Sequence, residues 1–433
     1  MADSPKPVRD IAETARDVKA GSFRMASLSE SLRNGALRAI AKSLLENGEA
    51  IFAANREDLS AGAESGLAEP LMKRLKFDRQ KLRDSVKGIE DLIGLPDPLF
   101  RTAFVRQLDE GLVLRRVTCP IGVIGVIFES RPDALVQIAS LCLKSGNCAI
   151  LKGGSEAAAT NRELFRLIRD AGLGAGLPES FLTLVETRAD IGALMGCHES
   201  IDLLIPRGSN EFVRHIMDHS SIPVMGHSDG ICHIYADKSA DPGKAIPVIR
   251  DAKTQYVAVC NAVECLLVHR DIAESLLPAV HADLTRLDVT LRGCPETLKI
   301  IPAIPAEEGD FGREYLDYTM AVKVVDGIDE AIGHINRFGS HHTDCIITED
   351  AEAAERFMLM VDSAGVYQNC STRFADGFRY GFGAEVGVST GKLHARGPVG
   401  LDGLVTYKYR LYGGGHVVAD YAEGRRSFNF RDL

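Results

Sequence analysis

The hydrophobic pattern of the chain changes near Val117. Before that point apolar residues recur at helical spacing, as at Leu37, Ile40 and Leu44, and we predict helices within residues 7–60 and 74–93. From Val117 on, short apolar runs alternate with segments of helical periodicity. The first run, VTCPIGVIGVIF, is nearly continuous, which is typical of a strand with both faces covered. The alternation predicts a doubly wound parallel sheet.

A second series of alternating helices and strands begins near Ser239 and predicts a second α/β unit. Two further segments fall outside both units. Residues 102–118 alternate around Asp109-Glu110-Gly111, which predicts a β-hairpin, and the tail segment LVTYKYRLYGGGHVV is strand-like. We expect these segments to pair in a separate small sheet that serves as an oligomer interface.

Composition narrows the class of protein. The chain has 433 residues, too many for one ordinary core, and its net charge of −10 argues against nucleic acid or an anionic membrane as partner. The longest uncharged apolar run, Ile121–Phe128, is far too short to cross a bilayer, and no secretory signal is evident. The ten cysteines are dispersed without a CxxC pair, which favours reduced thiols in the cytoplasm.

We expect no metal site. His215 and His219 lie four residues apart on a predicted helix and could share an ion, but no third ligand is near them in the sequence. A solvated or helix-capping role is the favoured interpretation of this pair.

Cys260 differs from the other nine cysteines in its setting. It lies in a polar-flanked loop between a predicted helix and the strand ECLLVH, with Lys253 and Asn261 as polar neighbours. A nucleophilic thiol needs access and a field that favours the thiolate, and this loop can provide both. The alternative is a buried small hydrophobe, the usual role of a free cysteine.

The segment ILKGGSE predicts an anion site. Lys152 ends a buried strand, Gly153 and Gly154 allow close backbone approach, and a helix begins directly after them. Lysine with Ser155, and no acid immediately after Lys152, suits a ribose 2′-phosphate and therefore NADP. An ordinary strand-to-helix turn is the alternative. The similar segment GLGAGL at 172–177 follows a helix, so we interpret it as a helix end and a loop.

Two other segments could contact a substrate. His341 and His342 lie in a loop between a helix and a strand, and because adjacent residues point apart, at most one would act. The glycine-rich stretch GFGAEVGVSTGKLHAR offers Lys392 and Arg396 as partners for an anion, with a solvated loop as the alternative.

Several motifs together resemble the γ-glutamyl phosphate reductase family, which belongs to the aldehyde dehydrogenase superfamily. The resemblance extends from the N-terminal helices to about Lys408. It rests on the following segments: Glu129–Pro132 (ESRP), Leu151–Glu156, Pro206–Gly208, Cys232–Ile234, Ala252–Gln255, Cys260–Asn261, Ala331–Ile346, Ser371–Phe374 and Lys392–Pro398. The sequence departs from the family at Tyr256-Val257, Ser209 and Phe338.

The resemblance implies an aldehyde-dehydrogenase-like fold with two doubly wound parallel-sheet domains and a small β oligomerisation sheet. Residues 1–101 and 119–238, with part of 371–400, would bind the cofactor. Residues 239–370 would carry the nucleophile, and residues 102–118 and 401–433 would form the oligomerisation strands and the tail.

The resemblance and the residue patterns described above together suggest roles for individual residues. Cys260 would be the nucleophile, with Asn261 and Ser130 as the other catalytic groups. NADPH would be held by Lys152, Gly153, Ser155, Gly208, Ser209 and Glu314, of which Glu314 would hold the nicotinamide ribose. The substrate would be held by Arg131, His341, Lys392 and Arg396.

The implied reaction is the NADPH-dependent reduction of L-glutamyl 5-phosphate to L-glutamate 5-semialdehyde, in proline biosynthesis. Hydrolytic aldehyde dehydrogenases carry a glutamate base before a Gly-Gly turn, and the corresponding stretch 223–227 has no acid. The expected partners are the small acyl phosphate, a glutamate kinase that hands it over, and further copies of the chain in a dimer or tetramer. A dehydrogenase of other specificity and a non-catalytic scaffold are the alternatives.

Overall fold

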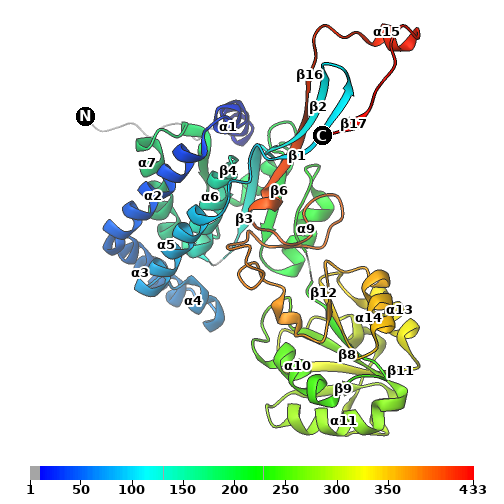
Figure 1. Cartoon of the computed structure of the whole chain (residues 1–433). Coiled ribbons are helices and arrows are strands. Elements are labelled where there is room, and N and C mark those ends of the chain that lie inside the picture. Colours follow the sequence, from blue (N-terminus) through cyan, green and yellow to red (C-terminus); the bar gives the residue numbers. More distant parts are fainter. Residues whose placement is uncertain (1–9, 130, 228) are drawn as a thin grey trace.

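A computed structural model describes residues 10–129, 131–227 and 229–433. Figure 1 shows two α/β units and a thin sheet that projects away from them. Apolar side chains form two separate cores, one in each α/β unit. The fold is therefore the two-domain α/β arrangement with a small additional sheet that the sequence predicts.

The first unit is built on a parallel sheet in the order β5-β4-β3-β6. Every residue of its two central strands is buried, as expected for strands with both faces covered. The strands are β3 (Val123–Phe128), β4 (Cys148–Lys152), β5 (Leu182–Val185) and β6 (Leu203–Arg207). The helices are α1 (Ile11–Met25), α2 (Glu30–Glu46), α3 (Gly48–Glu64), α4 (Glu69–Leu75), α5 (Arg79–Gly94), α6 (Pro132–Lys144), α7 (Ala158–Gly174), α8 (Arg188–Met195) and α9 (Asn210–His219).

The second unit contains a parallel sheet in the order β10-β9-β11-β8-β7-β12-β13. Its strands are β7 (Cys232–Ala236), β8 (Val263–His269), β9 (Thr290–Gly293), β10 (Ile304–Pro305), β11 (Thr319–Val325), β12 (Thr343–Ile347) and β13 (Gly365–Gln368). Its helices are α10 (Pro242–Thr254), α11 (Arg270–Thr285), α12 (Pro295–Leu298), α13 (Ile328–Phe338) and α14 (Ala351–Met360).

The projecting sheet is antiparallel, in the order β16-β2-β1-β17. It consists of β1 (Thr102–Asp109), β2 (Leu112–Pro120), β16 (Val405–Tyr412) and β17 (Arg431–Asp432), with α15 (Val418–Ala422) beyond β16. The predicted pairing of the hairpin with the tail is thus confirmed, since Lys408 lies opposite Val117. We call this sheet the arm.

Short elements complete the chain. They are the two-stranded sheet of β14 (Val388–Ser389) and β15 (Gly397–Pro398) and the 3₁₀ turns η1 (Ser155–Ala157), η2 (Glu179–Phe181), η3 (Glu308–Gly312), η4 (Thr372–Phe374) and η5 (Leu401–Leu404). Ala384, Val386 and Val399 pack into the core of the first unit, so the chain returns to that unit after β13.

Helix starts follow the local sequence. The side chain of Asp241 accepts a hydrogen bond from the backbone N–H of Gly243 at the start of α10, and Pro242 follows as the first helical residue. Ser209 caps α9 in the same way through the N–H of Phe212. The segment 172–177 is the end of α7 and a loop with a left-handed Gly176, as the sequence indicated.

The second sheet begins earlier than the predicted domain boundary at residue 238. Strand β7 precedes that boundary but lies between β8 and β12 in the second sheet. Strands β9 and β10 were not predicted, because TLRG and IP are too short and too polar to show a strand pattern. Among the described residues, no helix is both long enough and apolar enough to cross a bilayer.

Candidate active site

Cys260 lies in the turn between α10 and β8, on the side of the second sheet where its parallel strands begin. All ten cysteines are free thiols, and Cys260 is one of four that are not fully buried. Gly230 fits closely against this turn, because a Cβ atom added to it would lie 2.3 Å from the Cα atom of Cys260. The thiol therefore lies on a tightly packed turn and still reaches the surface.

A buried ion pair closes the base of this turn. Nζ of Lys253, in the last turn of α10, lies 2.7 Å from Oε2 of Glu264 on β8, and both side chains are fully buried. Glu264 also accepts a hydrogen bond from the backbone N–H of Leu316, in the segment that carries Glu314. Burial raises the pKa of Glu264 to about 7, and the charge of Lys253 opposes this rise. The pair fixes the two ends of the loop that presents Cys260.

Two histidines lie beside the thiol. One ring nitrogen each of His227 and His342 and the sulfur of Cys260 lie within 4.8 Å of one another. Nδ1 of His227 donates to the carbonyl oxygen of Val388 at 2.9 Å. His342 is fully buried, and its Nε2 atom has no hydrogen-bond partner among the described residues. The sequence did not single out His227, and it offered His342 only as the neighbour of His341, because sequence spacing does not show which loops converge.

His341, the predicted substrate ligand, occupies a different position from His342. Its Nδ1 atom donates to the carbonyl oxygen of Asp362, and its backbone is left-handed with φ of 60°. Adjacent side chains point apart, as expected, and His342 is the one beside Cys260. The sequence indicated that the two side chains would point apart, but it could not indicate which of them would lie beside Cys260.

Two arginines contribute positive charge near the thiol. Arg207, at the end of β6, has a buried Nη1 atom with no partner among the described residues. Burial and the charge of Arg131 lower the pKa of Arg207, and a charge on Cys260 raises it. Arg373, on η4, is buried, and its pKa is likewise lowered mainly by burial and raised by Cys260. Both arginines occur in the motifs of the family but were not predicted as site residues.

Asn261 positions the segment that carries Arg373. Its side-chain amide donates to the carbonyl oxygen of Ala375 at 2.9 Å, and its own carbonyl accepts from the hydroxyl of Thr372 at 2.7 Å. Its Oδ1 atom is buried and unpartnered among the described residues. The predicted catalytic residue Ser130 lies outside the described residues.

The other predicted substrate ligands have carboxylate partners. Lys392 and Arg396 both form ion pairs with Asp362, at 2.5 and 3.0 Å, and their hydrogen bonds and charges lower the pKa of that carboxyl. His341 contacts the backbone of the same residue, so three of the four predicted ligands gather around Asp362. Arg131, the fourth, forms an ion pair with Asp133 at 2.9 Å.

The predicted cofactor residues lie at two points of the first sheet. Lys152 is buried at the end of β4, where its ammonium donates to the carbonyl oxygen of Gly153, and Ser155 is exposed at the start of η1. A Cβ atom added to Gly153 would lie 2.3 Å from Nδ2 of Asn161, so any side chain here would have to displace that amide. A strand end, a tight glycine turn and a following helix are a suitable frame for a cofactor phosphate.

The second point is the start of α9. A Cβ atom added to Gly208 would lie 2.7 Å from the carboxylate of Glu129, which accepts a hydrogen bond from the backbone N–H of Ser209. Glu314 reaches this helix from the second unit, since Nδ2 of Asn210 donates to its carboxylate at 2.5 Å. Glu314 therefore bridges the two units beside the helix start, where a ribose hydroxyl would find a carboxylate partner.

A second group of similar side chains lies inside the second core. His233, Cys265 and His334 are all buried, with one nitrogen or sulfur atom of each within 4.8 Å of the others. Asp344 accepts from Nδ1 of His233, and Cys265 contacts His334 at 3.9 Å. His215 and His219 are exposed, and His219 donates to the carbonyl oxygen of His215 at the end of α9, which agrees with the capping interpretation.

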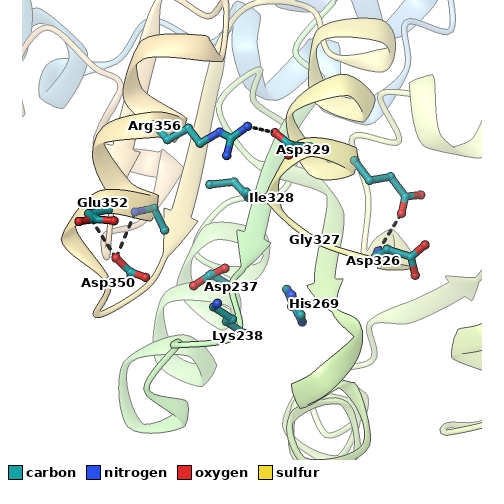
Figure 2. A pocket seen from close by; sticks show the side chains of 12 residues that line it. Asp237, Lys238, His269, Asp326, Gly327, Ile328, Asp329, Asp350, Glu352 and Arg356 are labelled. Atoms are coloured by element: carbon teal, nitrogen blue, oxygen red, sulfur yellow. Dashed lines mark hydrogen bonds and ion pairs between the residues drawn. The ribbon is translucent and has the colours of Figure 1, made fainter.

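A hollow of about 540 Å³ lies where the strands of the second sheet end, opposite the side at which Cys260 lies. Figure 2 shows its acidic lining, in which Asp329 pairs with Arg356 and the backbone N–H of Asp326 donates to the side chain of Glu330. None of the predicted site residues lines it. The hollow is thus separate from the Cys260 site.

Comparison with known proteins gives consistent matches. The sequence profile of the aldehyde dehydrogenase family matches residues 4–318. A γ-glutamyl phosphate reductase of Pelotomaculum thermopropionicum is 59% identical over 424 residues, and the match covers 98% of each chain. One from Synechococcus sp. (strain WH7803) is 51% identical over 433 residues, with both chains covered to 100%. The crystal structure of a γ-glutamyl phosphate reductase from Thermotoga maritima has a TM-score of 0.93 at 40% identity and covers 94% of this chain and 100% of its own.

These matches show that the chain belongs to the aldehyde dehydrogenase family, whose members are oxidoreductases that use a nicotinamide cofactor. Within that family it belongs to the γ-glutamyl phosphate reductases. The resemblance drawn from the sequence motifs is confirmed, and so is the fold class.

Proposed function

We propose that the protein reduces L-glutamyl 5-phosphate to L-glutamate 5-semialdehyde and phosphate, a step of proline biosynthesis, with NADPH as reductant. The names of its relatives support this activity. The observation that carries the proposal is the position of Cys260, an accessible thiol on a rigid turn with two histidines and two arginines around it.

The residues fit acyl transfer from a phosphate. The sulfur of Cys260 attacks the acyl carbon, a carbon–sulfur bond forms, and the bond to the phosphate oxygen breaks. Arg207 and Arg373 supply positive charge for the departing phosphate. The backbone N–H of Cys260 is the candidate donor to the carbonyl oxygen, and one such donor is typically worth about 3 kcal/mol.

The nicotinamide cofactor supplies the hydride that reduces the resulting thioester. The residues that would hold it are Lys152, Gly153 and Ser155 at the end of β4, Gly208 and Ser209 at the start of α9, and Glu314. The carbon–sulfur bond then breaks and releases the semialdehyde with Cys260 as thiolate. Lys152 with Ser155 favours the 2′-phosphate of NADPH over NADH.

The reverse reaction tests the function. Purified protein should reduce NADP⁺ when glutamate 5-semialdehyde and phosphate are both present, and omitting phosphate should stop multiple turnover, because phosphate is the acyl acceptor. The rate with NAD⁺ should be at least about tenfold lower at equal concentration, equivalent to ~1.4 kcal/mol. Steady turnover without phosphate, or a preference for other aldehydes or for NAD⁺, would support a dehydrogenase of other specificity instead.

The same assay tests the role of Arg207. Replacing it with glutamine should raise the KM for phosphate and leave the KM for the semialdehyde nearly unchanged. Arg16 has a solvent-exposed side chain on α1, and its glutamine variant is the control that should match the parent. Equal rises in both KM values would place Arg207 outside the phosphate position.

We further propose that the arm joins copies of the chain. Strand β16 is an eight-residue edge strand of the arm, and an unpaired edge is a ready template for association. Tyr407, Tyr409 and Leu411 on it are all more than half exposed. Sedimentation should show a dimer or tetramer, and the double variant Tyr407→Asp with Tyr409→Asp should reduce it to a monomer, whereas Tyr318→Asp in the second unit should not. A parent protein that sediments as a monomer would contradict this assignment.

A cytoplasmic location and direct transfer of the labile acyl phosphate from a glutamate kinase complete the proposal. Ten free thiols agree with a reducing compartment. Transfer would appear as a coupled rate with kinase that exceeds the rate with free acyl phosphate at its measured steady concentration.

A further inference from the structure

The hydrogen bond of His227 fixes the proton on its ring. Nδ1 lies 2.9 Å from the carbonyl oxygen of Val388, and a carbonyl oxygen can only accept. The neutral ring therefore carries its hydrogen on Nδ1, and Nε2 has a free lone pair. One ring nitrogen of His227 lies within 4.8 Å of the sulfur of Cys260, and since Nδ1 is used by Val388, Nε2 is the proton acceptor available near the thiol.

We propose that His227 is the general base of the reaction, which takes the proton of the Cys260 thiol during attack and passes it to the departing phosphate. This inference rests on the proposed function, because it assigns a proton path within that reaction. The stretch 223–227 has no acid where hydrolytic relatives would carry their base, and His227 is its one ionisable side chain.

The proton path balances the acyl-transfer step. The thiol loses its proton to Nε2 as the carbon–sulfur bond forms, and the ring becomes an imidazolium. The acyl carbon–oxygen bond breaks, and the imidazolium gives its proton to the phosphate oxygen that leaves. The thioester and hydrogen phosphate are the products, and the ring is neutral again. After hydride reduction the Cys260 thiolate takes up one proton from solvent.

His342 is less suited to this role. It is fully buried, and its Nδ1 atom faces the hydroxyl of Thr343 at 3.0 Å and the sulfur of Cys232 at 3.9 Å. The rings of His227 and His342 meet edge to face, with centroids 5.0 Å apart. His342 is fully buried and lies deeper in the protein than the half-buried His227. His342 therefore acts by packing against His227.

The charges around His227 support a neutral ring at neutral pH. Burial lowers the pKa of His227, and the charge of Arg207 lowers it further. The hydrogen bond to Val388 and the carboxylates of Glu314 and Asp229 raise it in part. Glu385, the other acid near the ring, has a pKa raised by its own burial. Cys260 and His342 are the remaining ionisable neighbours. The base is present above the lowered pKa, and turnover should fall as the pH drops through it.

His227→Asn is the direct test. The asparagine amide can still donate to the carbonyl oxygen of Val388, but it has no basic nitrogen. We expect kcat near pH 7 to fall about 100-fold, the lower end for a general base, with less than about a threefold change in KM for NADP⁺. The loss should shrink toward pH 9, because hydroxide in solution can then remove a thiol proton without a protein base. Added imidazole should restore part of the rate.

His198→Asn is the matched control. His198 is exposed, and its Nδ1 atom also donates to a backbone carbonyl, that of Gly196, remote in sequence from the Cys260 turn. This variant should keep the parental rate and pH profile. His342→Asn should lose less activity than His227→Asn and should not be rescued by imidazole. A pH-independent loss in His227→Asn, or a larger and rescuable loss in His342→Asn, would overturn the assignment.

A second readout does not depend on turnover. The rate of alkylation of Cys260 by iodoacetamide, located by peptide mass spectrometry, follows the thiolate fraction. In His227→Asn the pH profile of alkylation should shift to higher pH than in the parent. If the parent has no reductase activity but the shift is present, the proposed function fails and the thiol–histidine pair remains. If the parent has reductase activity but the alkylation profile does not shift in His227→Asn, the proposed function stands and only the role of His227 as base is wrong.

Discussion

Cys260→Ala should remove turnover and leave cofactor binding intact. The thiol is the group that would carry the acyl bond, so we expect kcat to fall by a factor on the order of 10⁴ or more. The residues that would hold the cofactor phosphate, Lys152, Gly153 and Ser155, lie at the end of β4 in the first unit, whereas the Cys260 turn belongs to the second unit. The Kd for NADPH, measured by fluorescence titration, should therefore stay within about twofold, or ~0.4 kcal/mol.

Cys265→Ala is the control for Cys260→Ala. Cys265 lies five residues further along, fully buried on β8 beside His334. Its replacement should lower the melting temperature through lost packing, while kcat stays close to the parental value. Residual turnover in Cys260→Ala near the parental rate would contradict the role of Cys260 as nucleophile.

Lys253→Met should lower both the free energy of unfolding and kcat. The substitution leaves Glu264 buried without its partner, which typically costs about 3–5 kcal/mol. The ion pair also closes the loop that presents Cys260 and contacts the segment of Glu314 through Leu316. We therefore expect lower kcat in the protein that remains folded, measured below its melting temperature. Denaturant unfolding gives the free energy of the loss.

The pH dependence of this loss has a definite sign. Burial holds the folded pKa of Glu264 near 7, above the usual value of a glutamate, so the folded state keeps a proton that the unfolded state has lost. The free energy of unfolding therefore falls as the pH rises from the usual pKa of a glutamate to about 7. Removing Lys253 raises the folded pKa of Glu264 further, so this fall continues to higher pH. The difference between parent and Lys253→Met should therefore be smaller near pH 5 than near pH 8.

A double variant separates charge from packing. Lys253→Met combined with Glu264→Leu replaces the ion pair with apolar side chains of similar size, and such replacements are often neutral in stability. The double variant should recover most of the free energy of unfolding. If Lys253→Met is as stable as the parent at both pH values, the pair does not secure the turn.

Much of the fold was predictable because buried strands and amphipathic helices leave a direct pattern. Helices α1 and α2 lie within the predicted helical range 7–60, and the tail pairs with β2 as expected. Strand β7 is the exception, because its residues were assigned to the first unit. A buried strand has the same composition in either sheet, so the sequence could not show which sheet it joins.

The candidate nucleophile could be singled out from the sequence, whereas its neighbours could not. Cys260 stands out in a polar-flanked turn, and the resemblance to the family supports it. His227, Arg207 and Arg373 come from three segments distant in sequence, and only the folded chain shows that they surround one thiol. Lys392 and Arg396 have the right chemistry for an anion, but Asp362 already pairs with both.

Trapping the acyl group tests the central claim most directly. Parent protein mixed with NADP⁺ and glutamate 5-semialdehyde, without phosphate, should make NADPH once and keep the acyl group. Acid quenching and peptide mass spectrometry should find a glutamyl adduct on the sulfur of Cys260, and phosphate added before the quench should remove it. NADPH formed without any adduct on that peptide, or with the adduct on another residue, would contradict the account.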